Sequence, residues 1–203
     1  MPQPRTDLMA ERIVLRPNSP EFAPHLCEAS RTSLATVGRW MSWCHPAFSE
    51  AEAREWYHAC LKNWDCGAEY EFSIFNVAGA YIGAAGLNQI NQQHNFANLG
   101  YWVCAGQQGR GYAAEAAKLL ATFGFNKLGL NRIEVVVAES NAPSRRVAEK
   151  CGASFEGVLR NRLLIHGSLF PAAMYSLLPE VGPNPSLNPD AHRQAFSPPA
   201  VAG

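Results

Sequence analysis

A glycine-containing turn in the middle of the chain, followed at once by an amphipathic helix, is the feature that most constrains the fold. Before the turn the chain has short segments rich in β-branched and aromatic residues, separated by turn-forming sequences. After Gly111, apolar residues recur at spacings of three and four, at Ala113, Ala116, Leu120 and Phe123, as they do in a helix that buries one face. The turn therefore joins a group of antiparallel strands to a helix.

The other elements follow from the same patterns and give a mixed α+β plan. Ser49 followed by Glu52 is typical of a helix capping box, and Asn141 is a favoured cap for a short helix that Gly152 ends. The mostly apolar segment 132–138 predicts a central strand covered on both faces. The predicted strands are 12–16, 71–76, 80–87, 97–104, 132–138, 155–165 and 169–178, and the predicted helices are two within 20–64, one from 111 to about 129, and one from 141 to 152.

Composition predicts one folded domain, residues 1–181, and excludes several classes of function. Hydrophobic residues make up 47% and charged residues 17% of the chain, which is an ordinary globular mixture. The 17 basic side chains balance the 17 acidic ones, so no overall positive charge attracts nucleic acid or an anionic membrane. There is no secretory signal and no apolar run long enough to span a bilayer, so we expect a cytoplasmic protein. Residues 182–203 are proline-rich and are expected to form a flexible tail.

The six cysteines do not predict a metal site. They form no C-x-x-C pair and show no ligand spacing with histidine, so we expect separate reduced thiols and no structural zinc.

The glycine turn itself predicts an anion site, because the first N–H groups of a helix lack intrahelical partners and glycine lets an anion approach the backbone closely. Two motifs fit the same residues. Gly109-x-Gly111-x-x-Ala114 matches the dinucleotide-binding fingerprint, but that fingerprint requires an immediately preceding buried strand and repeated strand–helix units, which this chain lacks. A helix entry that binds nothing is the other alternative.

Read as Gln108-x-x-Gly111-x-Ala113, the turn resembles the acyl-CoA pyrophosphate signature of the GNAT N-acetyltransferase superfamily. Three further segments resemble the RimJ/RimL-like branch of this superfamily. They are Arg12-Ile13-Val14-Leu15-Arg16, Gly100-Tyr101-Trp102-Val103, and the stretch from Asn141 through Ser144 and Gly152 to Gly157. Together these cover roughly residues 8–180. The resemblance implies a GNAT-type acyl-CoA N-acyltransferase fold, a mixed and mostly antiparallel sheet with helices on both faces, and acetyl-CoA as co-substrate.

The same resemblance implies roles for individual residues. Asn141 would bond the pantetheine arm, or would act only as a helix cap. Ser144 is the candidate general acid for the departing thiolate, with an ordinary first-turn serine as the alternative. Arg110 would add positive charge at the cofactor, or would be a surface side chain, and Cys104 reads as an inert thiol because no histidine is paired with it. The candidate cofactor-binding residues are Trp102, Val103, Cys104, Gln108, Gly109, Arg110, Gly111, Tyr112, Ala113, Asn141 and Ser144.

A general base is harder to assign. Related sequences often carry an acidic residue on a late strand, but this chain has Leu163, Leu164 and Pro171 there. His94, His166 and Glu71 are the candidates, each with an ordinary surface or turn role as the alternative.

The acceptor is expected to be a primary amine. An α-amine is roughly 10% neutral at pH 7 whereas a lysine amine is under about 0.1% neutral, which favours the N-terminus of a protein, a ribosomal protein being one candidate. The alternatives are a small amine (an antibiotic, a polyamine or an amino acid) and a non-catalytic acyl-CoA-binding sensor or scaffold. The acidic segment 50–71 would attract a basic peptide, or would be one solvated helix face. Relatives of this type often form homodimers, and periodicity reveals no interface here.

Overall fold

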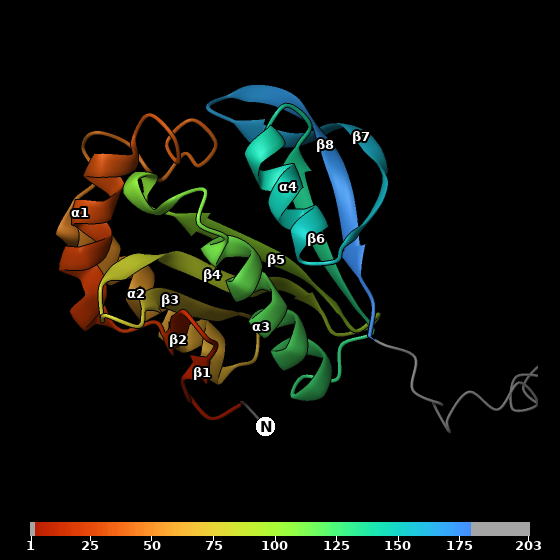
Figure 1. Ribbon diagram of the computed structural model, residues 1–203, viewed down its shortest axis with the longest axis horizontal. Helices are drawn as coiled ribbons and strands as arrows, with labels where there is room; N and C mark the ends of the chain where they lie inside the picture. Colours follow the sequence, from red (N-terminus) through yellow and green to blue (C-terminus); the bar gives the residue numbers. More distant parts are fainter. Residues whose placement is uncertain (1–2, 180–203) are drawn as a thin grey trace, which may run out of the picture.

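One mixed sheet organises residues 3–179, the part of the chain that this computed structural model describes (Figure 1). The expected tail at 182–203 lies outside the described residues. The strands are β1 Leu8–Met9, β2 Ile13–Pro17, β3 Tyr70–Asn76, β4 Tyr81–Asn91, β5 Phe96–Val103, β6 Arg132–Ala138, β7 Ser154–Ile165 and β8 Ser168–Leu177. The helices are α1 Ala23–Ser33, α2 Glu50–Asp65, α3 Tyr112–Asn126 and α4 Ala142–Lys150, with short 3-10 turns η1 Pro20–Phe22 and η2 Ala105–Gln107.

The sheet is split in the middle. Its order is β1-β2-β3-β4-β5-β6-β8-β7, and all neighbours are antiparallel except β5 and β6. This parallel pair is in register only from Phe96 to Asn98, opposite Arg132 to Glu134. Beyond Asn98, β5 stays paired with β4 as far as Val103, while β6 stays paired with β8. The two halves of the sheet therefore separate beyond Asn98.

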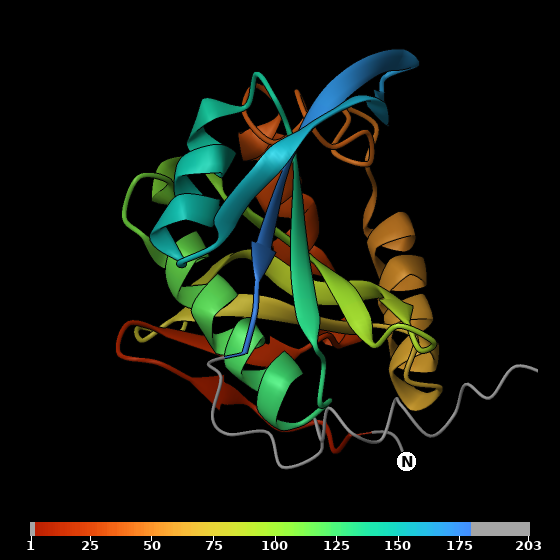
Figure 2. The same ribbon diagram turned by 90° about the vertical axis from the view of Figure 1, so that its right-hand side faces the viewer.

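Helices cover both faces of the sheet, as expected. Helices α1 and α2 lie on one side of β3 and β4, and α3 lies on the other side, where it reaches β5 (Figure 2). One buried cluster joins α3 to the sheet through fully buried side chains such as Phe72, Leu87 and Leu120. A second cluster joins α1 and α2 to the sheet around Tyr57, Ala84 and Trp102. Burial of apolar surface on both faces thus fixes the position of β5, which carries the glycine turn at its end.

Local signals in the sequence explain most element boundaries. Ser49 and Glu52 form the predicted capping box, and the side chain of Asn141 caps α4. The prediction for α3 was too long, because the helix ends at Asn126. The two-residue strand β1 carries too short a pattern to be predicted. Strand β6 is central, but Glu134 and Val136 are only half-buried, so the expected complete cover of both faces was wrong. Within residues 3–179 no helix combines the length and apolarity that a membrane crossing needs.

Candidate functional site

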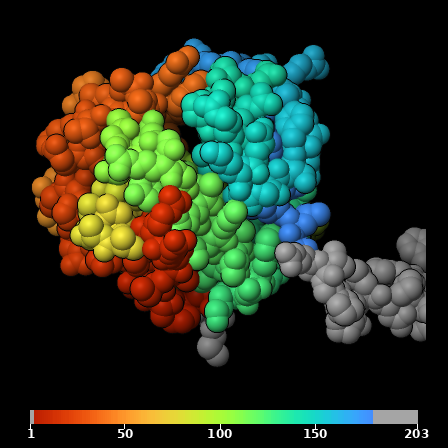
Figure 3. All heavy atoms as spheres, in the orientation of Figure 1, coloured from red at the N-terminus to blue at the C-terminus, as the bar shows by residue number. Residues whose placement is uncertain are grey.

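The split between β5 and β6 leads into a cavity of about 450 Å³, which we call the first cavity. In the space-filling view it is a hollow between the green residues of the glycine turn and the cyan residues of α4 (Figure 3). Its walls are the end of β5, the glycine turn, the start of α4, and part of the connection 34–49 between α1 and α2, which we call the roof loop. Three parts of the chain that are distant in sequence, 35–41, 101–114 and 140–150, therefore meet around one hollow.

The glycine turn presents unpaired N–H groups to this cavity. Gly109 and Gly111 have φ angles of +76° and +87°, in a region of backbone conformation that residues other than glycine adopt only at a cost in free energy. Gly111 caps α3 without any side-chain hydrogen bond. Within the described chain no protein acceptor meets the backbone N–H groups from Gly111 to Ala114. With the partial positive charge of a helix N-terminus, these groups suit an anion such as a phosphate.

The side chains of Arg12 and Gln108 hold the turn in place. The guanidinium of Arg12, just before β2, pairs with Glu115 at 2.7 Å and donates to the Arg110 carbonyl oxygen at 2.8 Å. A Cβ added to Gly111 would lie 3.2 Å from the Arg12 guanidinium, so this residue packs directly beneath the turn. On the other side, the Gln108 side chain donates to the Val103 carbonyl at 2.9 Å. The turn is thus fixed both to β2 and to the end of β5.

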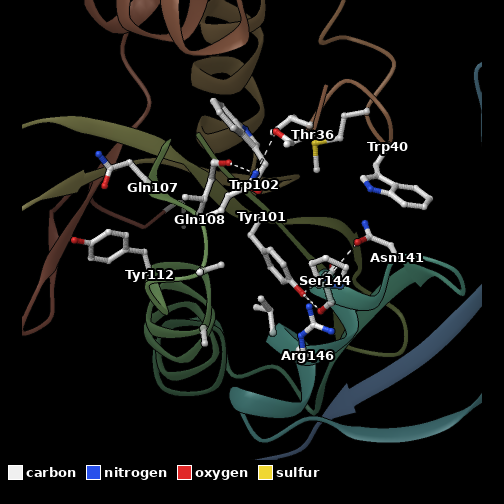
Figure 4. A pocket seen from close by; sticks show the side chains of 18 of the residues that line it. Thr36, Trp40, Tyr101, Trp102, Gln107, Gln108, Tyr112, Asn141, Ser144 and Arg146 are labelled. Carbon is white, nitrogen blue, oxygen red and sulfur yellow. Dashed lines mark hydrogen bonds between the residues drawn. The ribbon is translucent and has the colours of Figure 1, made fainter. Parts of the chain in front are cut away.

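On the opposite wall, helix α4 brings the Ser144 hydroxyl beside that of Tyr101 on β5. Asn141 Oδ1 accepts from the Ser144 backbone N–H at 3.2 Å, so the helix-cap role expected for Asn141 is present while the residue also lines the cavity. The Ser144 Oγ lies 3.2 Å from the Tyr101 hydroxyl, which also bonds the Ser144 carbonyl at 3.0 Å (Figure 4). Burial raises the pKa of Tyr101, so its hydroxyl stays protonated at neutral pH. The pair can deliver a proton into the cavity.

Most of the residues expected at the site line the first cavity, but two do not. The lining includes Trp102, Val103, Gln108, Gly109, Gly111, Tyr112, Ala113, Asn141 and Ser144. The Cys104 backbone N–H is bonded to the Ile82 carbonyl at 2.9 Å, and burial raises the pKa of its thiol to about 11. The Arg110 side chain is exposed, with its guanidinium 3.5 Å from the Gly106 carbonyl. The structure therefore places Cys104 in the strand pairing and Arg110 on the surface.

Several lining residues were missed by the sequence analysis. Tyr101 belonged to a recognised segment but had been given no role. Positive side chains come from Arg146 and Lys150 of α4, four residues apart and so on one helical face, a signal that was available in the sequence. The roof loop contributes Thr36, Arg39, Trp40 and Met41, and no local pattern indicates that a loop 60 or more positions before the turn covers it.

A second cavity of about 290 Å³ lies on the α1 and α2 side of the sheet, and Met41, Tyr101 and Trp102 line both cavities. It contains one of the three candidate bases, Glu71. His94 is exposed in the turn between β4 and β5. His166 sits in the β7–β8 turn, with its Nε2 2.7 Å from the Gly38 carbonyl oxygen of the roof loop. Of the three, Glu71 alone lines either cavity.

Comparisons with known proteins agree with this architecture. The family model described as "Acetyltransferase (GNAT) domain" matches residues 12–154. "Putative ribosomal N-acetyltransferase YdaF" of Bacillus subtilis is 29% identical over 83% of this chain and 92% of its own length. A solved structure from Vibrio cholerae, titled as a putative ribosomal-protein-serine acetyltransferase, is 32% identical with a TM-score of 0.77 and covers 87% of this chain and 99% of that one. RimL, a ribosomal L7/L12 α-N-protein acetyltransferase solved with coenzyme A, shares the fold at 20% identity, with a TM-score of 0.78 over 85% and 98% of the two chains.

Proposed function

Because this chain belongs to the GNAT acetyltransferase family, we propose that it transfers the acetyl group of acetyl-CoA to the N-terminal α-amine of a protein. One observation carries the proposal. The unpaired amides at the mouth of α3 and the separated edge of β5 border one cavity, and that cavity shares a wall with a second one on the opposite side of the sheet. A donor and an acceptor can therefore approach one point from two sides.

The residues present fit an acyl-CoA. The N–H groups from Gly111 to Ala114 are placed to receive its pyrophosphate, and Arg146 and Lys150 add positive charge to the same cavity. Beyond Asn98, the edge of β5 that faces away from β4 has no strand partner, so its backbone groups are available to the pantetheine arm. Gln108 and Arg12 hold the turn in position through their bonds to the Val103 and Arg110 carbonyls.

The co-substrate supplies an activated acetyl group as a thioester, and the protein supplies position and protons. We assign proton donation to Ser144, whose hydroxyl can protonate the departing thiolate as a general acid. Tyr101 donates to the Ser144 carbonyl at 3.0 Å, and its oxygen, 3.2 Å from the Ser144 Oγ, can accept from that hydroxyl, so we assign Tyr101 the role of orienting Ser144. Cys104 takes no covalent part in this scheme, since burial raises the pKa of its thiol and so disfavours the thiolate.

The choice of a protein N-terminus rests on two arguments. At neutral pH a larger fraction of an α-amine than of a lysine amine is already neutral and able to attack. In addition, two of the proteins that this chain resembles carry names that refer to ribosomal acetylation.

The test is acetyl transfer by the purified full-length protein. Acetyl-CoA would be offered with a panel of unblocked peptides, with the same peptides blocked at the α-amine, and with a panel of free small amines. We expect mass spectrometry to find one acetyl group on the unblocked α-amine. Transfer to small amines only would reject the protein acceptor, and CoA binding without transfer to any amine would reject the enzymatic proposal in favour of a sensor or scaffold.

A further inference from the structure

The carboxyl group of Glu71 occupies the space that a side chain at Gly86 would fill. Glu71 on β3 is in register with Gly86 on β4, which is in register with Gly100 on β5. A Cβ added to Gly86 would lie 2.1 Å from Glu71 Oε2 and 2.3 Å from Cδ. Any larger residue at position 86 would displace the carboxyl group, so the absence of a side chain there lets Glu71 lie across the neighbouring strand.

One oxygen of this carboxyl group is held and the other is left for a ligand. Asn88 Nδ2 donates to Glu71 Oε1 at 3.0 Å, and Asn98 Nδ2 donates in turn to Asn88 Oδ1 at 2.9 Å. Within residues 3–179, Oε2 meets no hydrogen-bond donor, and Glu71 forms no ion pair with any described Lys, Arg or His. A carboxyl group in an apolar cavity without a cation is unfavourable when ionised, which points to a ligand that supplies the positive charge.

The walls of the second cavity are apolar and largely aromatic. Trp43 packs edge-on against Trp102 and Phe48, with ring centroids 5.2 and 5.4 Å apart. Trp56 of α2 belongs to the same lining and remains 37% exposed, so it marks the side open to solvent. The faces of aromatic rings attract an ammonium group, and the apolar walls favour an apolar group attached to that ammonium group. A second charged group on the same ligand would lose its hydration against these walls.

Resting on the proposed function, we propose that the second cavity binds a primary ammonium group carried on an apolar group, and that Glu71 accepts its proton. Met41, Tyr101 and Trp102 line both cavities, so an amine beside Glu71 lies next to the wall shared with the first cavity. An N-terminal residue with an apolar side chain and a small apolar amine share this chemistry. An acidic first residue does not, because its carboxylate would face Glu71.

The ammonium group loses two protons during the transfer. One proton of the ammonium group passes to Glu71, which leaves a neutral amine. The nitrogen lone pair then forms a C–N bond with the thioester carbonyl carbon while the C–S bond breaks. The departing thiolate takes a proton from Ser144, and the second proton lost by the nitrogen restores that hydroxyl. The products are the amide, the free thiol, and a proton that Glu71 releases to water.

The acidity of Glu71 suits this role. Burial raises the pKa of its carboxyl group to about 7, a shift that the Asn88 hydrogen bond opposes and the charge of Glu69 reinforces. The groups packed around it are Glu69 just before its own strand, the Cys60 thiol on α2, and the uncharged Asn88 on β4. A base with a pKa near the working pH is both partly ionised and strong enough to take a proton.

The test compares E71Q with the control E69Q, which removes the same charge two residues away. The Glu69 side chain accepts a hydrogen bond from Asn63 and does not line the second cavity. We expect kcat/KM for the amine to fall on the order of 10²-fold at pH 7 in E71Q and to stay within about twofold in E69Q, while the Kd for CoA is unchanged in both. The residual rate of E71Q should continue to rise with pH until the pH reaches the pKa of the amine itself. Equal kcat/KM values in E71Q and the unmodified protein would overturn the proposal.

Two further measurements separate this inference from misfolding and from the proposed function. Because the Glu71 pKa is raised, the stability cost of ionising Glu71 grows from about pH 4.5 to about pH 7 and is complete above that, so E71Q should unfold no more readily than the unmodified protein at pH 8. Peptides beginning with Leu or Phe should react at least tenfold faster than those beginning with Asp, and small apolar amines show whether the peptide is needed. Equal rates for Leu and Asp peptides would contradict the apolar cavity, whereas no transfer by the unmodified protein would instead refute the proposed function.

Discussion

The two cavities are built in different ways. In the first, the proposed anion site is made from backbone groups of one turn and from the beginnings of two helices, which lie in short contiguous motifs, and only the roof loop comes from a distant part of the chain. The second is made from side chains of α1, the roof loop, α2 and three strands, each contributing one or a few residues. Recognition by the main chain leaves a readable pattern of glycines and caps in the sequence, and recognition by assembled side chains does not.

The shared wall limits how independent the cavities are. Trp102 and Tyr101 are consecutive on β5 and line both cavities, but Tyr101 bonds Ser144 of α4 while Trp102 packs with the cluster under α1 and α2. Substitutions in the second cavity should therefore lower the turnover of the amine more than the affinity for CoA, and substitutions in the glycine turn should do the reverse. The following changes test that separation.

The largest effect in the first cavity is expected for Ser144→Ala. Loss of the proton donor should lower kcat on the order of 10²-fold or more, while the Kd for CoA changes by less than about threefold. Y101F removes only the hydroxyl behind Ser144 and should cost about tenfold. Steady-state kinetics and CoA titration by calorimetry measure both, with the exposed Ser168→Ala as a matched control. A tyrosine variant more damaging than the serine variant would reverse the two roles.

Gly86→Ala tests the second cavity from the backbone side. The added methyl group must push the Glu71 carboxyl group away, since the two would lie 2.1 Å apart. We expect kcat/KM for the amine to fall about tenfold while the affinity for CoA is retained. Gly106→Ala, where the methyl group enters open space, is the control. A change in CoA affinity equal to the loss in amine turnover would show that the cavities are not separable.

Gly111→Ala should act on the first cavity with a smaller effect. An alanine at a φ of +87° costs about 1–2 kcal/mol and crowds Arg12, so the unpaired amides shift and the Kd for CoA rises several-fold. Gly79→Ala has a similar φ of +81° in the distant β3–β4 turn and contacts nothing within 4 Å. Urea unfolding should show a comparable loss of stability in both variants, and calorimetry should show weaker CoA binding only in the first.

The smallest effect concerns the strands that carry α4. Arg132 on β6 and Ser176 on β8 hold Glu156 of β7, and their hydrogen bonds lower the Glu156 pKa to about 2, in that order of importance. A depressed pKa means that this contribution to stability is present above about pH 4.5 and is lost as the pH falls toward 2. E156Q should therefore unfold more readily at pH 7 but show a flatter acid transition, measured by circular dichroism. An unchanged acid transition would remove Glu156 from this role.

The residues of the glycine turn illustrate what could be predicted locally. Gln108, Gly111 and Asn141 were placed at the site by motif alone, and the structure gives each a mechanical reason: a bond to the Val103 carbonyl, a positive φ, and a helix cap. Arg110 and Cys104 belong to the same segment, yet neither lines the first cavity. A motif indicates the path of the backbone more reliably than the direction of each side chain.

The sequence by itself determined the order of the elements, the family and the first cavity's backbone, because glycines, caps and hydrophobic periods act within a few residues of where they occur. Only the tertiary structure decided that β5 and β6 separate after Asn98, that the roof loop covers the split, and that Glu71 rests on Gly86 beneath aromatic walls. Those features depend on contacts between residues far apart in the chain. A single sequence shows no local pattern for such contacts, because they form only when the chain folds.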